Sequence, residues 1–338
     1  MENKKSKEEL LKESLCVIYN KDFFVGLGEN LLTIARRYNR KTSLLYIFIE
    51  NFKDIIKSSG ETVAENLFRS LCLKLRYTLR ESDFLARLSP ESVAILVSET
   101  DSFGAIMLTR RIENAFTSAD REPEASCSSF RLNIVSATAP EEGKTIAALI
   151  EKAEQKLERK RRSLAADRDI EKLDFWETAN FLIDKKPQVS PAGHSPCSFQ
   201  DFTIRQNFSL SFIDHVQQYI LQEAIINKKR RGFLFLGIQQ FKKPELNMQN
   251  YHVLKNIDTV IYLIGHKGEQ PCSVPYVIPV YLPDEKIRSY RFIFFLVDKY
   301  AYGLMGKEES VNQFSGFHTS DFYFVESIIS KLLMSYFY

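Results

Sequence analysis

The chain has 338 residues, of which 44% are hydrophobic and 26% are charged. At roughly 100 to 200 residues per domain the length favours two domains, and the composition excludes low-complexity, collagen-like and wholly disordered chains. Lysine plus arginine exceed aspartate plus glutamate by only 46 to 43, so the net charge gives no basis for expecting nucleic-acid binding or adhesion to anionic membranes, and any anion site must be local.

Helix and strand patterns alternate along the first half of the chain. The expected elements are a helix over residues 24–38, a strand over 44–49, a helix over 62–79, strands over 84–88 and 93–97, a helix over 102–116, a strand over 130–137 and a helix from Thr145. Ser89, Pro90, Glu91 and Ser92 separate the two short strands, which are typical of a hairpin. The order αβαββαβα predicts an α/β fold in which helices cover a sheet.

A change of composition separates the two halves. Residues 1–165 contain 13 aromatic side chains and residues 166–338 contain 29. Residues 186–198 include three prolines, one glycine and three serines, which cannot continue a helix or a central strand. We therefore expect a first domain over 1–165, a helical and Pro-rich linker over 166–198, and a second, mixed α/β domain over 199–338.

The second domain is predicted to be richer in strands. Its expected elements are a helix over residues 211–226, strands over 233–237, 259–264, 277–280, 291–297 and 301–305, and a closing apolar helix over 320–337.

Cysteine and histidine spacing favours neither disulfides nor a metal site. The five cysteines lie far apart without a CxxC pair, and the five histidines never stand three or four residues apart. The N-terminal sequence is too polar for a signal peptide, and the longest apolar stretch, residues 292–297, is far shorter than the roughly 18 to 20 residues of a membrane helix. We expect a cytoplasmic protein with no membrane span, no metal site and no bound cofactor.

Three short segments of the first domain share a recognisable pattern. Residues 15–23 keep the Leu, Tyr-Asn-basic and Phe positions of the motif D-x-LTGLYNR-x-x-F. Residues 48–53 (FIENFK) correspond to the motif D-x-D-x-F-K. Residues 87–96 (RLSPESVAIL) correspond to R-x-GGDEF and the strand that follows it. In these segments the domain resembles a degenerate GGDEF domain, the family of diguanylate cyclases that join two GTP molecules into cyclic di-GMP. The resemblance implies a GGDEF-like sheet covered by helices.

The resemblance also places losses on the metal-carrying strand and in the catalytic loop. Phe48 stands at the first metal-binding Asp and Glu50 at the second, Ser89 and Pro90 replace the two glycines, Glu91 keeps an acid, and Ser92 replaces the loop Glu. Joining nucleoside triphosphates needs carboxylate-held divalent metal, which Phe48 and Ser92 do not supply. Pro90 has no N–H to offer a phosphate. We therefore expect no cyclase activity.

The guanine-contacting positions of the substrate site are affected in the same way. Ile56 stands where the family has Asn, and Glu65 where it has Asp. One polar contact is therefore lost and one is kept.

A second motif of the family is retained. Arg80-Glu81-Ser82-Asp83 is followed by five residues and then by Ser89. Many diguanylate cyclases carry an RxxD motif at this spacing, which binds the product, and Arg111 falls at the family's second binding arginine. A guanidinium can pair with guanine O6 and N7 or with a phosphate, and the Asp83 carboxylate can accept from guanine N–H groups.

A purely structural interpretation of the motif stays open. An RxxD match is short, and Arg80 lies at a helix C-terminus, where the helix dipole favours a cation. Asp83 could pair with Arg80, Arg76 or Arg87 in the folded chain. Arg110, beside Arg111, is expected to face solvent.

The second half is similar to the DICT domain, a presumed sensory module that accompanies GGDEF domains in bacteria. The similarity lies in residues 208–211 (FSLS), 236–241 (LGIQQF), 260–265 (VIYLIG) and 314–321 (FSGFHTSD). It names no ligand. Gln239, Gln240, Tyr251 and Tyr262 are candidates for lining a pocket, with simple core packing as the alternative.

These features predict a catalytically inactive GGDEF-DICT regulatory protein that binds cyclic di-GMP through Arg80, Asp83 and Arg111. The alternative is a protein–protein scaffold or signalling adaptor that binds no nucleotide. Cyclic di-GMP and a signalling protein are the expected partners, and a homodimer is a further expectation.

Overall fold

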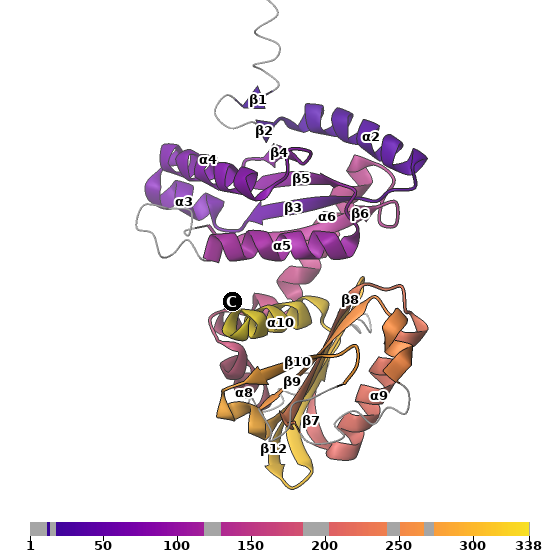
Figure 1. The fold of residues 1–338 in the computed structure, drawn as a ribbon. Coiled ribbons are helices and arrows are strands. Elements are labelled where there is room, and N and C mark those ends of the chain that lie inside the picture. The colour runs from indigo at the N-terminus through magenta and orange to yellow at the C-terminus, as the bar shows by residue number, and fades with distance from the viewer. Residues whose placement is uncertain are drawn as a thin grey trace, which may run out of the picture. The chain divides into compact units, whose positions relative to one another are not determined.

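The computed structural model describes residues 12–13, 18–117, 130–184, 203–241, 251–266 and 274–337. The chain divides into two compact units, Met1–Arg159 and Lys160–Tyr338 (Figure 1). The Pro-rich segment expected at 186–198 lies outside the described residues.

The first unit is built on a six-stranded sheet in the order β1-β2-β4-β5-β3-β6. Only β2 and β4 pair in parallel; the other neighbours are antiparallel. The strands are β1 (Lys12–Glu13), β2 (Ile18–Tyr19), β3 (Thr42–Ile49), β4 (Phe84–Ser89), β5 (Ser92–Ser98) and β6 (Leu132–Ala139). The predicted hairpin of β4 and β5 is confirmed, with Ser89 opposite Ser92 and Pro90 and Glu91 between them.

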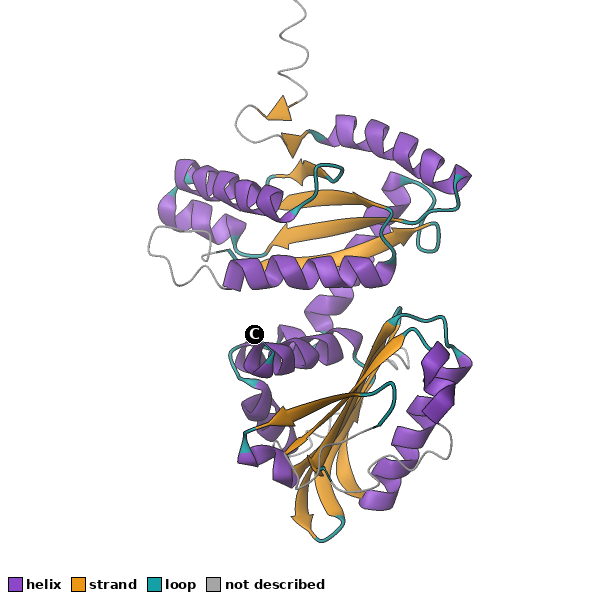
Figure 2. Cartoon of the chain, viewed as in Figure 1, coloured by secondary structure: helices purple, strands orange, loops and turns teal. Residues whose placement is uncertain are grey.

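Helices cover both faces of this sheet (Figure 2). They are α2 (Lys21–Arg37), α3 (Phe52–Ser59), α4 (Glu61–Thr78), α5 (Ser102–Thr117) and α6 (Ile146–Arg162). Leu45 and Ile47 of β3 belong to the core cluster that α3, α4 and α5 contribute to. A Cβ on Gly28 of α2 would meet the Ile146 side chain of α6 at 2.6 Å, so the two helices pack closely.

The start of α2 and the junction of α3 with α4 have local causes. The Asn20 side chain caps α2 by accepting from the Phe23 N–H at 2.9 Å. Between α3 and α4, Gly60 adopts φ +89°, a conformation that glycine reaches without strain. The sequence patterns predicted α4 but not the short helix α3.

The second unit is built on a seven-stranded sheet in the order β10-β9-β8-β11-β12-β13-β7. Strands β10, β9 and β8 are parallel neighbours, and the remaining pairs are antiparallel. The strands are β7 (Thr203–Ser209), β8 (Gly232–Gln240), β9 (Thr259–His266), β10 (Ile278–Leu282), β11 (Tyr290–Val297), β12 (Tyr300–Ser310) and β13 (Gln313–Thr319). Strands β7 and β13 were not predicted from the sequence.

Two hydrophobic cores flank the second sheet. Helix α9 (Leu210–Ile226) packs on one face, where Ile220 and Leu221 meet Ile293 and Phe295. Helix α10 (Phe322–Tyr336) contributes to the other core, and short helical turns η3 (Leu164–Ala166), η4 (Tyr251–Asn256) and η5 (Glu285–Ser289) complete the unit.

The linker expected over 166–198 needs correction in its first part. Helix α7 (Arg168–Glu171) contributes Ile170 to the core that contains Phe294. Helix α8 (Phe175–Asp184) contributes Phe175, Trp176 and Leu182 to the same core. The Lys331 ammonium of α10 donates to the Ile170 carbonyl at 2.5 Å and to Thr178 Oγ1 at 3.1 Å. The segment is helical, as expected, but its apolar face is buried in the second unit.

Candidate functional site

Arg80 and Asp83 lie together in a tight turn after α4. The Asp83 Oδ2 atom accepts from the Arg80 backbone N–H at 3.0 Å, and the Asp83 N–H donates to the Arg80 carbonyl at 3.1 Å. Asp83 is 4% exposed, whereas the Arg80 side chain is exposed. The carboxylate therefore closes the turn from inside and leaves the Arg80 guanidinium in solvent.

Two further arginines surround this turn. Arg111 of α5 donates from Nη2 to the Thr78 carbonyl at 2.6 Å, and Arg76 of α4 donates from Nη1 to the Asp83 carbonyl at 2.9 Å. Arg111 is exposed and Arg76 is half-buried. The structure thus brings together Arg80, Asp83 and Arg111. Arg76 joins this group by its hydrogen bond to the backbone carbonyl of Asp83.

Burial is the main influence on the Asp83 carboxyl. It raises the pKa of Asp83 above the ordinary value of 3.8, while the hydrogen bond from the Arg80 N–H and the charges of Arg80, Arg111 and Arg76 partly oppose the increase. Because the pKa of Asp83 is still raised overall, keeping its carboxylate charged in this position costs free energy.

The expectation that Arg110 faces solvent is wrong. Arg110 is 6% exposed, and Ile106, one turn earlier on the same face of α5, is 8% exposed. Arg111 lies on the exposed side of the helix. Arg110 and Arg111 are adjacent in the sequence, but the helix places Arg111 on the solvent side and Arg110 on the buried side.

Asp83 provides a direct test of the turn. Because the folded pKa of Asp83 is raised, the contribution of this carboxyl to stability is fully present below the unfolded value of 3.8 and is lost as the pH rises through the folded pKa. We expect Asp83→Asn to keep the acceptor for the Arg80 N–H and to be at least as stable as wild type at pH 7, with a flatter pH profile. Asp83→Ala leaves that N–H unpaired and is expected to lose about 1 to 2 kcal/mol. Denaturant unfolding between pH 3 and 8 measures both, and equal losses in the two variants would contradict the role of the hydrogen bond.

The polar residues at the signature positions are bonded within the first unit. Ser89 Oγ and Ser92 Oγ lie 2.6 Å apart, and Glu91 pairs with Lys53 at 2.8 Å. Glu50 Oε1 accepts from the Asn133 side chain at 2.8 Å, and Phe48 is half-buried. Phe48 and Ser92, at positions where the resemblance leads us to expect ligands of a divalent cation, carry no carboxylate. Within the described part of the chain, no three His, Cys, Asp or Glu residues form a group suited to a metal ion.

Arg87 fills the space beside this hairpin. Its guanidinium makes two bonds to the Glu65 carboxylate, at 2.6 and 3.1 Å, and lies 3.9 Å from the centre of the Phe68 ring. It also donates to the Pro90 carbonyl at 3.1 Å. Glu65, which stands at a position expected to contact guanine, is therefore bonded to a side chain of the protein itself.

Comparison with known protein families assigns the first part of the chain to one of them. The family model described as diguanylate cyclase, GGDEF domain, matches residues 13–165. Residues 13–165 form a GGDEF domain. The diguanylate cyclase TpbB of Pseudomonas aeruginosa is 27% identical over 163 residues, which are 48% of this chain and 38% of TpbB. The probable diguanylate cyclase DgcC of Escherichia coli is 27% identical over 123 residues, 36% of this chain and 33% of DgcC.

Solved structures also include GGDEF domains that match this part of the chain. The GGDEF domain of TpbB from Pseudomonas aeruginosa is 28% identical, with a TM-score of 0.39, and the match covers 45% of this chain and 88% of that one. The chain spans less than half the length of the curated relatives named above. Of the helices in the described ranges, none combines the length and the apolar character required to cross a membrane.

Two of the residues proposed to line a pocket in the second unit, Gln239 and Tyr262, contact other side chains. Tyr262 stacks on Phe235 at 4.9 Å within the core, and Gln239 is hydrogen-bonded to Glu308. The Tyr251 side chain lies outside the described residues.

A different hollow of about 460 Å³ lies at the start of α9 and the β12–β13 turn. Its polar lining includes Ser209, Ser211, Asp214, His215, Gln218 and Asn312. The sequence patterns did not predict this hollow, because its walls come from two segments that are far apart in the sequence, residues 209–218 and 312–313.

Proposed function

We propose that this protein is a catalytically inactive regulator that binds cyclic di-GMP at the end of α4. The observation that carries the proposal is the group of three guanidiniums, of Arg76, Arg80 and Arg111, around one buried carboxylate, Asp83. Arginine recognises both phosphate and the O6/N7 edge of guanine, and cyclic di-GMP presents both.

The exposed guanidiniums of Arg80 and Arg111 are assigned the direct contacts. The Arg111 anchor to the Thr78 carbonyl holds one Nη atom and leaves other N–H groups of the same guanidinium for a ligand. Asp83 holds the turn that carries Arg80. Because Asp83 is only 4% exposed, its carboxylate must rotate outward to contact a guanine.

The proposed loss of catalysis is supported by the side chains at the signature. Phe48 offers no oxygen, Pro90 offers no N–H, and the hydroxyls of Ser89 and Ser92 bond to each other. Formation of cyclic di-GMP from GTP and Mg²⁺ by the purified chain would contradict this part of the proposal.

Calorimetric titration of cyclic di-GMP into the full chain tests the receptor function. We expect saturable binding by wild type and a dissociation constant about 10- to 100-fold higher in Arg80→Ala, because a charge-assisted contact is lost. Arg37→Ala is the matched control, since Arg37 is also exposed but lies on α2 beside Tyr38. Absence of binding by wild type at about 100 μM ligand would overturn the proposal.

The burial of Asp83 favours a second candidate, a scaffold that binds no nucleotide. In that case the RxxD motif is retained because Asp83 closes the turn after α4. Native mass spectrometry of protein purified from its own host separates the two, because a receptor carries a nucleotide adduct and a scaffold carries a protein partner.

We propose further that the second unit is a sensory module of the DICT type. The residues similar to that family lie in β7, the start of α9, β8, β9 and β13, and the hollow beside α9 is available to a small ligand. Together with the GGDEF domain, this arrangement supports a regulator in which ligand binding changes interaction with a signalling protein.

A further inference from the structure

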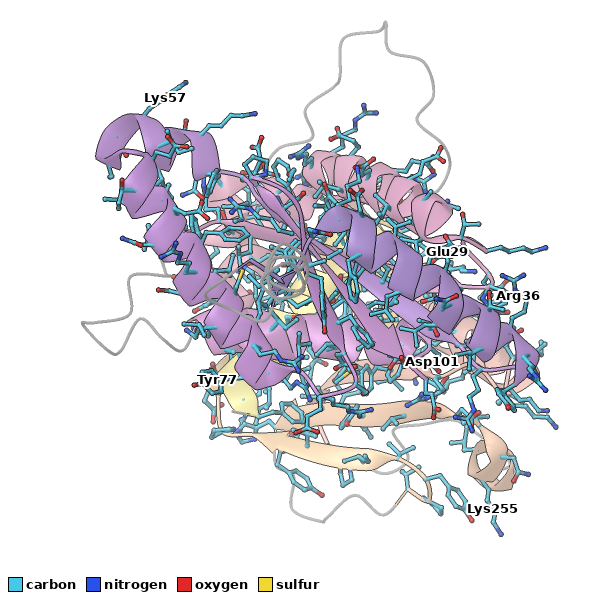
Figure 3. All side chains as sticks on the ribbon, turned by 90° about the horizontal axis from the view of Figure 1, so that it is seen from above. Glu29, Arg36, Lys57, Tyr77, Asp101 and Lys255 are labelled. Atoms are coloured by element: carbon cyan, nitrogen blue, oxygen red, sulfur yellow. The ribbon has the colours of Figure 1, made fainter. Side chains whose placement is uncertain are left out.

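Tyr77 is the most exposed large hydrophobic side chain of the described residues, at 90%. It lies one residue before the end of α4, and Figure 3 shows its side chain projecting outward from the first unit. Leu73, one turn earlier, is 47% exposed and extends the apolar surface beneath the ring. The end of α4 thus presents an uncovered aromatic face to solvent.

Cations surround the backbone next to this ring. Arg111 donates to the carbonyl of Thr78, the residue after Tyr77, and Arg76 precedes Tyr77 directly in α4. The exposed Arg80 follows the end of the helix. The exposed acid nearby is Glu81, and the other acid, Asp83, is buried, so positive charge predominates at this surface.

Tyr38 on α2 provides an internal comparison. It is 61% exposed, and the guanidiniums of Arg37 and Arg40 lie 5.7 and 6.0 Å from the centre of its ring. Both guanidiniums therefore already make cation–π contacts with the Tyr38 ring. Among residues 18–117, no cation is placed over the Tyr77 ring in this way, because Arg76 and Arg111 are tied to backbone carbonyls instead.

An exposed ring and exposed arginines at the same end of α4 offer the two kinds of contact that a nucleotide accepts. Aromatic side chains stack on nucleobases, and guanidiniums bind the phosphates and the polar edge of guanine. Resting on the proposed receptor function, we propose that Tyr77 is a stacking platform for a guanine base of cyclic di-GMP held by Arg80 and Arg111. The GGDEF motifs themselves do not include this residue.

Calorimetric titration of the full chain with cyclic di-GMP tests the stacking role. We expect Tyr77→Ala to raise the dissociation constant about tenfold or more, within the range that base–aromatic stacking supports. Tyr77→Phe keeps the ring face and is expected to bind as wild type does. Tyr38→Ala is the matched exposed-tyrosine control and is expected to leave binding unchanged. Alanine is the best helix former, so thermal unfolding should show no loss of stability in Tyr77→Ala.

The outcomes separate this inference from the receptor function on which it rests. If wild type binds, Arg80→Ala binds more weakly as expected, and Tyr77→Ala binds as wild type does, the stacking role is overturned and the receptor function stands. If Phe fails as Ala does, the hydroxyl rather than the ring face is required, and stacking is again overturned. If Tyr77→Ala leaves binding unchanged but converts a dimer to a monomer in sedimentation, the ring is a protein contact. Absence of binding by wild type overturns both proposals.

Discussion

Replacing Phe175 with alanine is expected to lower the free energy of unfolding of the second unit by about 3 to 5 kcal/mol. Phe175 is fully buried, and its ring centre lies 4.8, 5.6 and 6.2 Å from those of Trp176, Phe292 and Phe294. Truncation removes these edge-to-face contacts and leaves a cavity between α8 and β11. If α8 were part of a linker, the same substitution would leave stability unchanged.

Trp176, the single tryptophan of the chain, makes this measurement selective. It is 3% exposed and adjoins Phe175, so its fluorescence during denaturant unfolding reports on the second unit. Phe337→Ala is the control, because Phe337 is 36% exposed and loses far less contact. Equal shifts of the unfolding midpoint in the two variants would show that α8 does not support this core.

Replacing Arg87 with alanine is expected to destabilise the first unit by about 2 to 3 kcal/mol. The Arg87 side chain is 14% exposed and joins the Phe68 ring, the Glu65 carboxylate and the Pro90 carbonyl. Its loss removes the stacking contact and leaves the hairpin turn without its cross-link to α4. We expect hydrogen exchange to increase first at the ends of β4 and β5.

Glu65→Gln is the matched control for the contribution of charge. The amide oxygen can still accept from Arg87, so we expect a loss below about 1 kcal/mol, also because Glu65 is 37% exposed. Circular dichroism during denaturant unfolding and amide exchange measure the two variants together. If Arg87→Ala were no less stable than Glu65→Gln, the guanidinium would not be what holds the hairpin.

Local patterns predicted most elements of the first unit. The alternation and turn residues of β4 and β5, and the 3.6-residue periodicity of α4, are properties of adjacent residues. The short strands β1 and β2 and the short helix α3 carry too few residues for a clear period. In the second unit, the edge strand β7 and its neighbour β13 combine polar residues with apolar ones, and the sequence patterns did not separate them from loops.

The sequence by itself determined which chemical groups stand at the GGDEF signature and at the RxxD motif, because residue identity and spacing are local. Only the tertiary structure decided that Arg87 engages Glu65, 22 residues away, that Asp83 faces inward while Arg80 faces solvent, and that α8 lies in the core of the second unit. These outcomes depend on which surfaces meet when distant segments pack, and burial then sets both the charge state and the partners of each side chain.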